Sequence, residues 1–327
     1  MKKIIHLSHR PCARVLKTGL TTRRLGYAVE FWQQTAREDF LPRFKHTQFF
    51  SDGDDLVERL HEAKPDLVYV HVCGAPELAA LAKAGAGRRP VLCDIHDLDI
   101  MRFNTTSAYE ESVFAIADAL VFSSAGYETL CRRWKPAQVS VLPQAVVPPA
   151  MLPEDILGIN QLPRRPGLVY QGGISRNMPH RRMTGIVKRA TEAGISVVVY
   201  AANGSAADKS ALMNAGATVV TGYYYRPMLN ELTRYDFGLC GCDEKNRALQ
   251  QSGPNKFFEY AAAGTPIVTV NAGNQLRLAE GLNVGVNVAD IADIKNIDPR
   301  QFDGFRLVPT MLDYQGRLKE LYQQLLS

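Results

Sequence analysis

A lysine and a glutamate stand three residues apart within residues 253–268, which read Gly-Pro-Asn-Lys-Phe-Phe-Glu-Tyr-Ala-Ala-Ala-Gly-Thr-Pro-Ile-Val. A Gly-Pro turn leads into a helix that Gly264 ends and Pro266 keeps from resuming. Lys256 and Glu259 therefore project from the same side of the first helical turn, near its positive end. A cation, a carboxylate and backbone N–H groups together suit a ligand that carries phosphate and hydroxyls. The alternative is an ordinary αβ unit whose charges are solvated.

The same segment resembles the nucleotide-sugar-binding segment of the GT-B glycosyltransferases, in particular their large, mostly retaining group. The resemblance implies that Lys256 contacts the donor diphosphate and that Glu259 binds the ribose hydroxyls. Many members carry another glutamate eight positions before the ribose-binding one, where this chain has the uncharged Gln251. The implied contacts to the donor sugar are Gln251 and Asn255. The resemblance covers most of residues 66–270.

A second part of the implied donor site is the segment Gln171-Gly172-Gly173-Ile174-Ser175-Arg176. Paired glycines let the backbone approach a ligand closely, and arginine binds phosphate in a bidentate fork. The resemblance places Gly173 and Arg176 at the donor diphosphate, with Arg181 preferred over Arg182 as a further cation. In the loop Gly222-Tyr-Tyr-Tyr-Arg-Pro it implies that Tyr224 stacks on the nucleotide base.

Alternating strands and helices predict an α/β fold in both halves of the chain. The resemblance implies two Rossmann-like domains facing across a cleft, the GT-B arrangement, with a C-terminal helix that crosses back to the first domain. Six prolines between residues 143 and 166 interrupt regular structure. The predicted parts are an acceptor-side domain (1–147), a proline-rich linker (148–166), a nucleotide-sugar-binding domain (167–308) and a C-terminal helix (309–327).

In the first half, apolar residues at helical spacing predict a helix over residues 25–37. The stretch from Ser8 to Gly19 is then expected to be the loop after the first strand. Related enzymes often have a Gly-Gly pair in this loop, which the chain lacks. The departure favours a specialised, anionic acceptor, with His9 and Gly19 as its acceptor-side contacts.

The segment Asp94-Ile95-His96-Asp97 ends another predicted strand of the first half. It resembles the strand-terminal histidine of the family, which faces the transferred sugar. His96 and Asp97 are accordingly the predicted catalytic residues: His96 can bond a sugar hydroxyl, and an aspartate can orient it or act as a general base. The alternative is that Asp97 caps the next helix and that His96 is a satisfied loop residue.

The composition is that of a globular protein long enough for two domains, with 46% hydrophobic and 22% charged residues among 327. Neither a membrane-spanning segment nor a signal peptide is evident, so we expect a cytoplasmic protein with reduced cysteines. The pair Cys240 and Cys242 has no partner pair at metal-binding spacing, and we predict no metal site. No nucleophile elbow, dinucleotide fingerprint or P-loop is present.

The net charge of +5 is uneven, because residues 1–50 hold ten Lys or Arg against three Asp or Glu. This excess can attract an anionic membrane surface, a nucleic acid or an acidic acceptor, or it can be a solvated face. We therefore expect peripheral contact with the inner membrane surface through these residues, and regard nucleic acid as a less favoured partner.

The resemblance implies a metal-independent glycosyltransferase of polysaccharide biosynthesis, which moves a sugar from a nucleotide-diphosphate donor to a hydroxyl acceptor. No cofactor is expected, and a UDP-sugar is favoured over a GDP-sugar as the donor. The acceptor is a glycan, a lipid-linked or another anionic molecule. The alternatives are a DNA-base glycosyltransferase of phage type, a non-catalytic nucleotide- or sugar-binding protein on the same fold, and an epimerase.

Overall fold

The contacts of the chain, seen in a computed structural model, divide it into two compact units. Unit 1 comprises Met1–Ala145 and Thr310–Ser327, and unit 2 comprises Val146–Pro309. Most of the predicted linker, residues 148–164, lies outside the described residues. The structure describes residues 1–10, 12–35, 47–72, 75, 77–96, 107–123, 139–141, 165–223, 225–245, 250–251, 253–302 and 308–327.

Unit 1 contains a seven-stranded parallel sheet in the order β3-β2-β1-β4-β5-β6-β7. Its short strands are rich in buried apolar side chains, as expected of a parallel sheet covered on both faces. The strands are β1 (Lys3–Ser8), β2 (Ala28–Gln33), β3 (Thr47–Phe49), β4 (Leu67–Val72), β5 (Val91–Ile95), β6 (Ala119–Phe122) and β7 (Val139–Val141).

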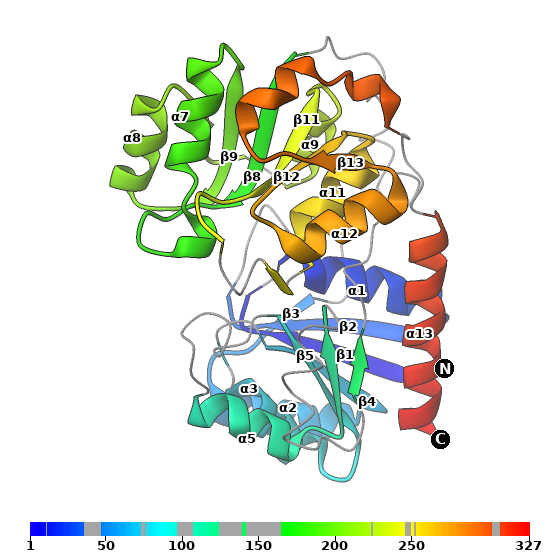
Figure 1. The fold of residues 1–327 in the computed structure, drawn as a ribbon. Helices are drawn as coiled ribbons and strands as arrows, with labels where there is room; N and C mark the ends of the chain where they lie inside the picture. Colours follow the sequence, from blue (N-terminus) through cyan, green and yellow to red (C-terminus); the bar gives the residue numbers. More distant parts are fainter. Residues whose placement is uncertain are drawn as a thin grey trace. The chain divides into compact units, whose positions relative to one another are not determined.

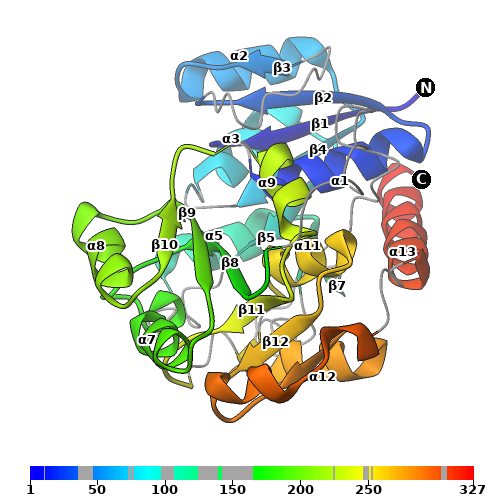
Figure 2. The same ribbon diagram turned by 90° about the horizontal axis from the view of Figure 1, so that it is seen from above.

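Helices cover the sheet of unit 1 on both faces. Figure 1 shows α2 (Gly53–Ala63), α3 (Glu77–Ala86) and α5 (Ala108–Ile116) together on one face. The other face carries α1 (Ala13–Arg24) and the C-terminal helix α13 (Val308–Leu326), which lie side by side in both views (Figures 1 and 2).

The C-terminal helix is part of the core of unit 1. Leu318, Leu321 and Tyr322 of α13 are buried against Ile4 and Tyr69 of the sheet. The hydroxyl of Tyr322 lies 2.6 Å from Oγ1 of Thr22, and that of Tyr314 donates to Oγ1 of Thr18 at 3.1 Å, so α13 also bonds to α1. The prediction that the last helix returns to the first half of the chain is confirmed.

The predicted helix over residues 25–37 is wrong. The helix lies earlier, over Ala13–Arg24, and the residues after it form strand β2. Gly26 separates the two elements with a backbone φ of 91°, a conformation that glycine adopts without strain. The expected loop from Ser8 to Gly19 therefore ends where α1 begins.

Unit 2 contains a six-stranded parallel sheet in the order β10-β9-β8-β11-β12-β13. Helices α7 and α8 cover one face and α9, α11 and α12 the other (Figures 1 and 2). The strands are β8 (Leu168–Gly173), β9 (Val197–Asn203), β10 (Thr218–Val220), β11 (Phe237–Gly241), β12 (Ile267–Val270) and β13 (Gly285–Asn287). The helices are η4 (Pro179–Arg181), α7 (Thr184–Glu192), α8 (Ala206–Asn214), α9 (Tyr225–Leu232), α11 (Asn255–Ala263), α12 (Gly273–Leu282), η5 (Ile291–Asn296) and η6 (Pro299–Gln301).

The order of strands reverses once in each sheet. In unit 1 the reversal lies between β1 and β4, and in unit 2 it lies between β8 and β11. Ligands of open parallel sheets bind at such reversals, beyond the carboxyl ends of the strands. The predicted α/β fold with two parallel sheets is confirmed, and each sheet has one edge at which a ligand is expected.

Gly19 supplies a test of the packing between α1 and the sheet. A Cβ at this position would overlap the ring of Phe31, whereas a Cβ at Gly316 of α13 would meet nothing within 4 Å. We expect Gly19→Ala to lower the free energy of unfolding by about 1–3 kcal/mol through overpacking. Gly316→Ala, the matched control, should be neutral or stabilising, because alanine favours helices. Chemical denaturation measures both, and a Gly19→Ala variant as stable as the wild type would contradict the described packing.

Candidate functional site

The carboxyl end of β8 lies beside the first turn of α11 in unit 2. A Cβ added to Gly172, whose φ is 135°, would lie 3.4 Å from Nζ of Lys256. The same ammonium stands over the ring of Tyr170, 3.9 Å from its centroid. The structure therefore brings the Gly-Gly segment and Lys256 together at the strand reversal.

Glu259 is held by β8 as well. The residue is 3% exposed, and its carboxylate accepts a hydrogen bond from the side-chain amide of Gln171. The backbone N–H of Gln171 in turn donates to the hydroxyl of Tyr260 at 2.9 Å, and this hydroxyl donates to the carbonyl of Val169 at 3.3 Å. Tyr260 thus ties α11 to β8 and fixes Lys256 and Glu259 at the strand end.

The local sequence explains how α11 presents these residues. Its N-cap is Pro254, which offers no side-chain acceptor to the first-turn N–H groups. Its C-cap is Gly264 in the left-handed conformation with φ of 67°, as predicted from the glycine. The helix begins at Asn255, so Lys256 lies in the turn where the helix dipole favours an anion.

The cation beside Gly173 is Arg181, and not Arg176, which was the arginine matched by its position in the sequence. A Cβ added to Gly173 would lie 2.8 Å from Oδ1 of Asn203 and 3.1 Å from the guanidinium of Arg181. Arg176 instead pairs with Asp208 at 3.3 Å, and its side chain is 54% exposed. Of the two predicted arginines, Arg181 is the one that lies against the glycine.

The other residues predicted for the donor site are placed only in part. Gln251 and Asn255 are both half-buried, and Asn255 is the first residue of α11. Tyr224 lies outside the described residues. The neighbouring Tyr223 donates from its hydroxyl to the carbonyl of Tyr200 at 3.2 Å, so it packs on β9.

In unit 1, polar side chains gather on the sheet face that α1 and α13 cover. Alternate residues of a strand point to the same face, and here His6, Tyr69, His71, Asp94 and His96 continue the rows that begin with apolar residues. The first four are buried in β1, β4 and β5, and His96 directly follows β5. The apolar ends of these rows pack on α13, and the polar ends lie near the strand reversal.

Asp94 is the acceptor at the centre of this cluster. Its Oδ2 accepts from Nε of Arg14 at 2.9 Å and from the hydroxyl of Tyr69 at 3.2 Å, and its Oδ1 pairs with the other side of the same guanidinium. Burial alone would raise the pKa of Asp94, but the charges of Arg14 and His96 lower it well below its usual value. A buried carboxylate therefore persists because a buried arginine compensates it.

A chain of hydrogen bonds crosses the cluster from α1 to β5. Oγ1 of Thr22 lies 3.2 Å from Nε2 of His6, and Nδ1 of His6 lies 3.1 Å from Nε2 of His71. Nδ1 of His71 then lies 3.3 Å from Nε2 of His96, whose Nδ1 faces Sγ of Cys12 at 3.7 Å. His96, predicted as catalytic, thus lies within this chain of hydrogen bonds, between His71 and Cys12.

The three histidines differ in charge because their surroundings differ. Burial lowers the pKa of His6 well below its usual value and that of His71 to about 4, so both are neutral near pH 7. Burial also acts to lower the pKa of His96, but the charges of Cys12 and Asp94 outweigh it and raise that pKa well above its usual value.

One atom each of His71, Asp94 and His96 lies within 4.8 Å of the others, a spacing at which a metal ion is a chemical alternative. Asp94 is already paired with the guanidinium of Arg14, whose positive charge opposes a second cation. Hydrogen bonds and ion pairs account for all three side chains, and we treat the cluster as an ion-pair network. Metal independence stays a prediction.

The predicted acceptor-side residues lie in different settings. His9 follows β1 and its Nδ1 lies 2.7 Å from Oε1 of Gln34. Gly19 lies inside α1 against Phe31, where packing alone requires a glycine. The acceptor contact of Gly19 stays a prediction, and the packing against Phe31 explains the glycine without it. Asp97, the second predicted catalytic residue, lies outside the described residues.

The ten basic residues of the first 50 do not form one exposed face. Arg14 and Lys17 are buried at 4% and 2% exposure. Lys2 pairs with Asp66, and Lys3 pairs with Glu30. Exposed bases in the described part of this stretch include Arg10, Arg23 and Arg24, while Arg37, Arg43 and Lys45 lie outside the described residues.

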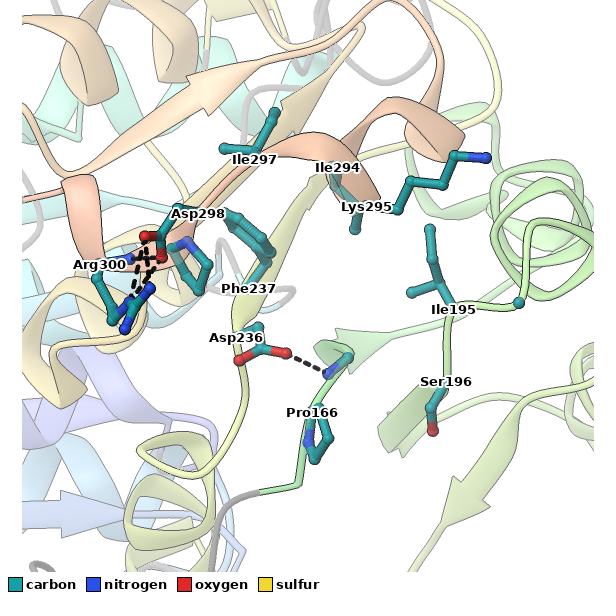
Figure 3. Close-up of a pocket in the computed structure, with 13 residues that line it drawn as sticks. Pro166, Ile195, Ser196, Asp236, Phe237, Ile294, Lys295, Ile297, Asp298 and Arg300 are labelled. Carbon is teal, nitrogen blue, oxygen red and sulfur yellow. Dashed lines mark hydrogen bonds and ion pairs between the residues drawn. The ribbon is translucent and has the colours of Figure 1, made fainter.

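A pocket of about 600 Å³ lies at the opposite edge of the unit 2 sheet (Figure 3). Its walls include the residues at which β8, β9 and β11 begin, together with η5 and η6. Asp236 accepts there from the backbone N–H of Gly167 at 2.8 Å, and Asp298 pairs with Arg300 at 3.0 Å. Asp236, Asp298 and Arg300 thus have partners of their own, and the predicted donor residues lie elsewhere.

Comparisons with known proteins find glycosyltransferases. The family model described as "Glycosyl transferase 4-like domain" matches residues 6–148. A search of curated protein sequences finds no match. Among solved structures, AviGT4, a glycosyltransferase involved in avilamycin A biosynthesis, is 14% identical, with a TM-score of 0.69 over 99% of this chain and 98% of its own.

Two further structures are similar over nearly their whole length. Anabaena HepE in complex with UDP and glucose is 17% identical, with a TM-score of 0.66 over 99% of this chain and 98% of its own. An α-glucosyltransferase in complex with UDP is 13% identical, with a TM-score of 0.65 over all of both chains. It has also been solved with a 13-mer DNA containing a HMU base.

The fold is that of a GT-B glycosyltransferase. The resemblance predicted from residues 253–268 is therefore confirmed for the fold, and the family match adds support in the first half of the chain. In the GT-B fold described here, no helix of the described residues is long and apolar enough to cross a membrane.

Sequence reasoning missed the residues that hold the predicted ones. Gln171, Tyr170 and Tyr260 position Glu259 and Lys256 in the GT-B fold, yet they read as ordinary strand and helix residues. In unit 1 the alternation of histidines and acids at every second position of adjacent strands was an available signal. It points to one polar sheet face.

The neutral, buried His71 predicts how stability depends on pH. Its pKa is lowered from about 6.5 to about 4, so the unfolded chain binds a proton before the folded one as the pH falls. The free energy of unfolding should therefore decrease below about pH 6.5, by about 1.4 kcal/mol per pH unit from His71 alone. Urea denaturation between about pH 7 and pH 5 measures this slope, and His71→Gln should reduce it by that amount. An unchanged slope in His71→Gln would show that His71 is not a buried neutral group.

Proposed function

We propose that the protein transfers a sugar from a UDP-sugar to a hydroxyl acceptor, without a metal ion. The observation that carries the proposal is the joint position of Lys256 and Glu259 at the β8–β11 reversal. There the cation lies against Gly172 and the carboxylate is bonded to Gln171. The ammonium of Lys256 can bind a diphosphate, and the carboxylate of Glu259 can accept hydrogen bonds from ribose hydroxyls.

In the proposed donor site, different residues bind the diphosphate, the sugar and the base. Lys256 and the N-terminal turn of α11 bind the donor diphosphate, with Arg181 approaching from the Gly173 side. These groups stabilise the negative charge that develops on the leaving nucleoside diphosphate as the sugar departs. Gly173 lets the backbone approach the phosphates, and Arg176 is a further candidate once it leaves Asp208. Gln251 and Asn255 are proposed for the sugar, and Tyr224 for the base.

The choice of UDP over GDP rests on the similar structures. HepE and the α-glucosyltransferase are both solved with UDP, and HepE also with glucose. Their identity to this chain is low, so the donor is a proposal for the experiment below.

His96 and Asp97 are the residues proposed to act on the transferred sugar in unit 1. The imidazole of His96 has a raised pKa and is therefore a hydrogen-bond donor at both nitrogens near pH 7. Asp94 and His71 both face Nε2 of this imidazole and orient it, and Arg14 in turn holds Asp94. Both ring nitrogens face partners within the cluster, so the role proposed for His96 is to place a positive charge near the transferred sugar.

We propose a glycan or lipid-linked acceptor of polysaccharide biosynthesis, reached at the cytoplasmic side of a membrane. DNA-base glucosylation is the second candidate, because the similar α-glucosyltransferase is solved with DNA that contains a HMU base. The exposed Arg10, Arg23 and Arg24 suit either a lipid surface or a phosphodiester backbone.

Calorimetric titration with UDP and with uridine separates the two proposed donor roles. Lys256→Gln should weaken UDP binding by about 10- to 100-fold and leave uridine binding unchanged, because only UDP carries the diphosphate. Glu259→Gln should weaken both ligands by a similar factor, since both carry the ribose hydroxyls.

The exposed pair Lys188 and Glu192 on α7 provides matched controls. Lys188→Gln and Glu192→Gln should bind both ligands as the wild type does. Equal loss of UDP and uridine affinity in Lys256→Gln would contradict the diphosphate role, and unchanged affinity in Glu259→Gln would contradict the ribose role.

A turnover assay separates transfer from the non-catalytic and epimerase alternatives. The protein is incubated with a UDP-sugar and one of two acceptors, a membrane lipid extract or HMU-containing DNA. If the protein is a transferase, UDP release should require the acceptor. Transfer of the labelled sugar to DNA, together with DNA binding that falls steeply with added salt, would favour the second candidate. Tight UDP binding without turnover on any acceptor would favour a binding protein, and an isomerised nucleotide sugar formed without an acceptor would identify an epimerase.

A further inference from the structure

Cys12 has a setting that neither the fold nor the proposed transfer reaction explains. It is the N-cap residue of α1, and its thiol is only half-buried. Sγ lies 3.7 Å from Nδ1 of His96, which is within hydrogen-bonding range for sulfur. An imidazole at a thiol is the arrangement by which cysteine nucleophiles are activated.

The far nitrogen of the same imidazole is also occupied. Nε2 of His96 lies 3.7 Å from Oδ2 of Asp94 and 3.3 Å from Nδ1 of His71. The order thiol, imidazole, carboxylate is the arrangement of a nucleophile, a base and an orienting acid. Asp94 is anchored by Arg14 in the first turn of α1, so the imidazole has a fixed partner on the side opposite the thiol.

The charged and titratable groups around the pair come from five elements. Asp94 of β5 is the carboxylate nearest His96, and His71 and His6 are neutral near pH 7. Around Asp94, the guanidinium of Arg14 supplies the compensating charge, and burial keeps the pKa of its neighbours Tyr69 and Tyr314 above their usual values. The groups are Arg14 on α1, His6 on β1, Tyr69 and His71 on β4, Asp94 on β5 and Tyr314 on α13.

These surroundings favour a thiolate and an imidazolium over the neutral pair. Burial raises the pKa of Cys12, but the charge of His96, its hydrogen bond and the backbone N–H groups of Val15 and Arg14 together lower it below its usual value. Those N–H groups belong to the first turn of α1, whose dipole acts in the same direction.

We propose that Cys12 is a site of covalent modification by soft electrophiles, namely peroxides and small disulfides, because His96 holds its half-buried sulfur as a thiolate. With hydrogen peroxide, the sulfur attacks one oxygen, an S–O bond forms and the O–O bond breaks. The departing hydroxide takes a proton from His96 and leaves as water, so the sulfur is oxidised to a sulfenic acid and the peroxide is reduced. A small thiol such as glutathione can then displace the sulfenic oxygen as water and form a mixed disulfide. This inference does not depend on the proposed transferase function.

Other cysteines of the same chain provide internal controls. Cys93, Cys240 and Cys242 are fully buried. Burial raises the pKa of Cys93 far above its usual value and that of Cys240 to about 12. In the folded protein all three thiols are shielded from solvent, and those of Cys93 and Cys240 are also held protonated, so the three should react slowly.

The test is the pH dependence of iodoacetamide alkylation of the full chain, read out at each cysteine by mass spectrometry between about pH 5 and pH 9. At about pH 6, Cys12 should react roughly tenfold faster than glutathione, because its larger thiolate fraction outweighs its lower intrinsic nucleophilicity. Its rate should also reach a plateau at a lower pH than that of glutathione. A Cys12 profile that matches glutathione in the wild type would overturn the proposal.

His96→Gln supplies the matched variant, because glutamine keeps a hydrogen-bonding side chain but carries no charge. The Cys12 profile should move to higher pH in this variant, with its fold checked by circular dichroism. An unmoved profile in folded His96→Gln would overturn the role of His96. Should the variant not fold, the wild-type profile decides alone.

A peroxide arm tests the named reagents directly. Hydrogen peroxide followed by dimedone should label Cys12 before the buried Cys93, Cys240 and Cys242. Absence of label at Cys12, in protein whose Cys12 alkylates rapidly at about pH 6, would overturn modification by peroxides.

Discussion

Parallel strands deliver all their carboxyl ends to one edge of a sheet, and both candidate sites depend on this constraint. The strand order reverses between β1 and β4 in unit 1 and between β8 and β11 in unit 2. At each reversal the connecting segments leave in opposite directions and uncover the strand ends. In unit 2 the uncovered end is Gly172-Gly173, with Lys256 and Glu259 beside it. The chemistry of the site follows from which residues the chain places at these ends.

In unit 1, the corresponding edge of the sheet holds a buried pair of opposite charges. Asp94 and Arg14 are nearly inaccessible to water, and removal of either would leave the other as an uncompensated buried charge. At His71, burial outweighs the nearby charge of Asp94 and keeps the imidazole neutral. At His96, the charges of Cys12 and Asp94 outweigh burial and keep the imidazole protonated. Tyr314 and Tyr322 of α13 close this face through bonds to α1, so the last helix of the chain completes the surroundings of a cluster built near its start.

The sequence predicted the elements whose signals are local. The helix with Lys256 and Glu259 has a glycine at its end, and it was found with its correct bounds. The first helix was misplaced because it buries Arg14, Lys17 and three threonines, so its core-facing side shows no apolar period. The polar cluster of unit 1 was missed for another reason. Its contacts join residues 16 to 300 positions apart, such as His6 with Thr22 and Thr22 with Tyr322, and only the fold brings them together.

The most direct test of the central claim is a crystal structure of the protein with UDP. The account predicts that the diphosphate lies within hydrogen-bonding distance of Nζ of Lys256 and of the first-turn N–H groups of α11, and that the ribose hydroxyls contact Glu259. UDP bound in the pocket at the opposite edge of the sheet, or bound with its diphosphate away from Lys256, would contradict it.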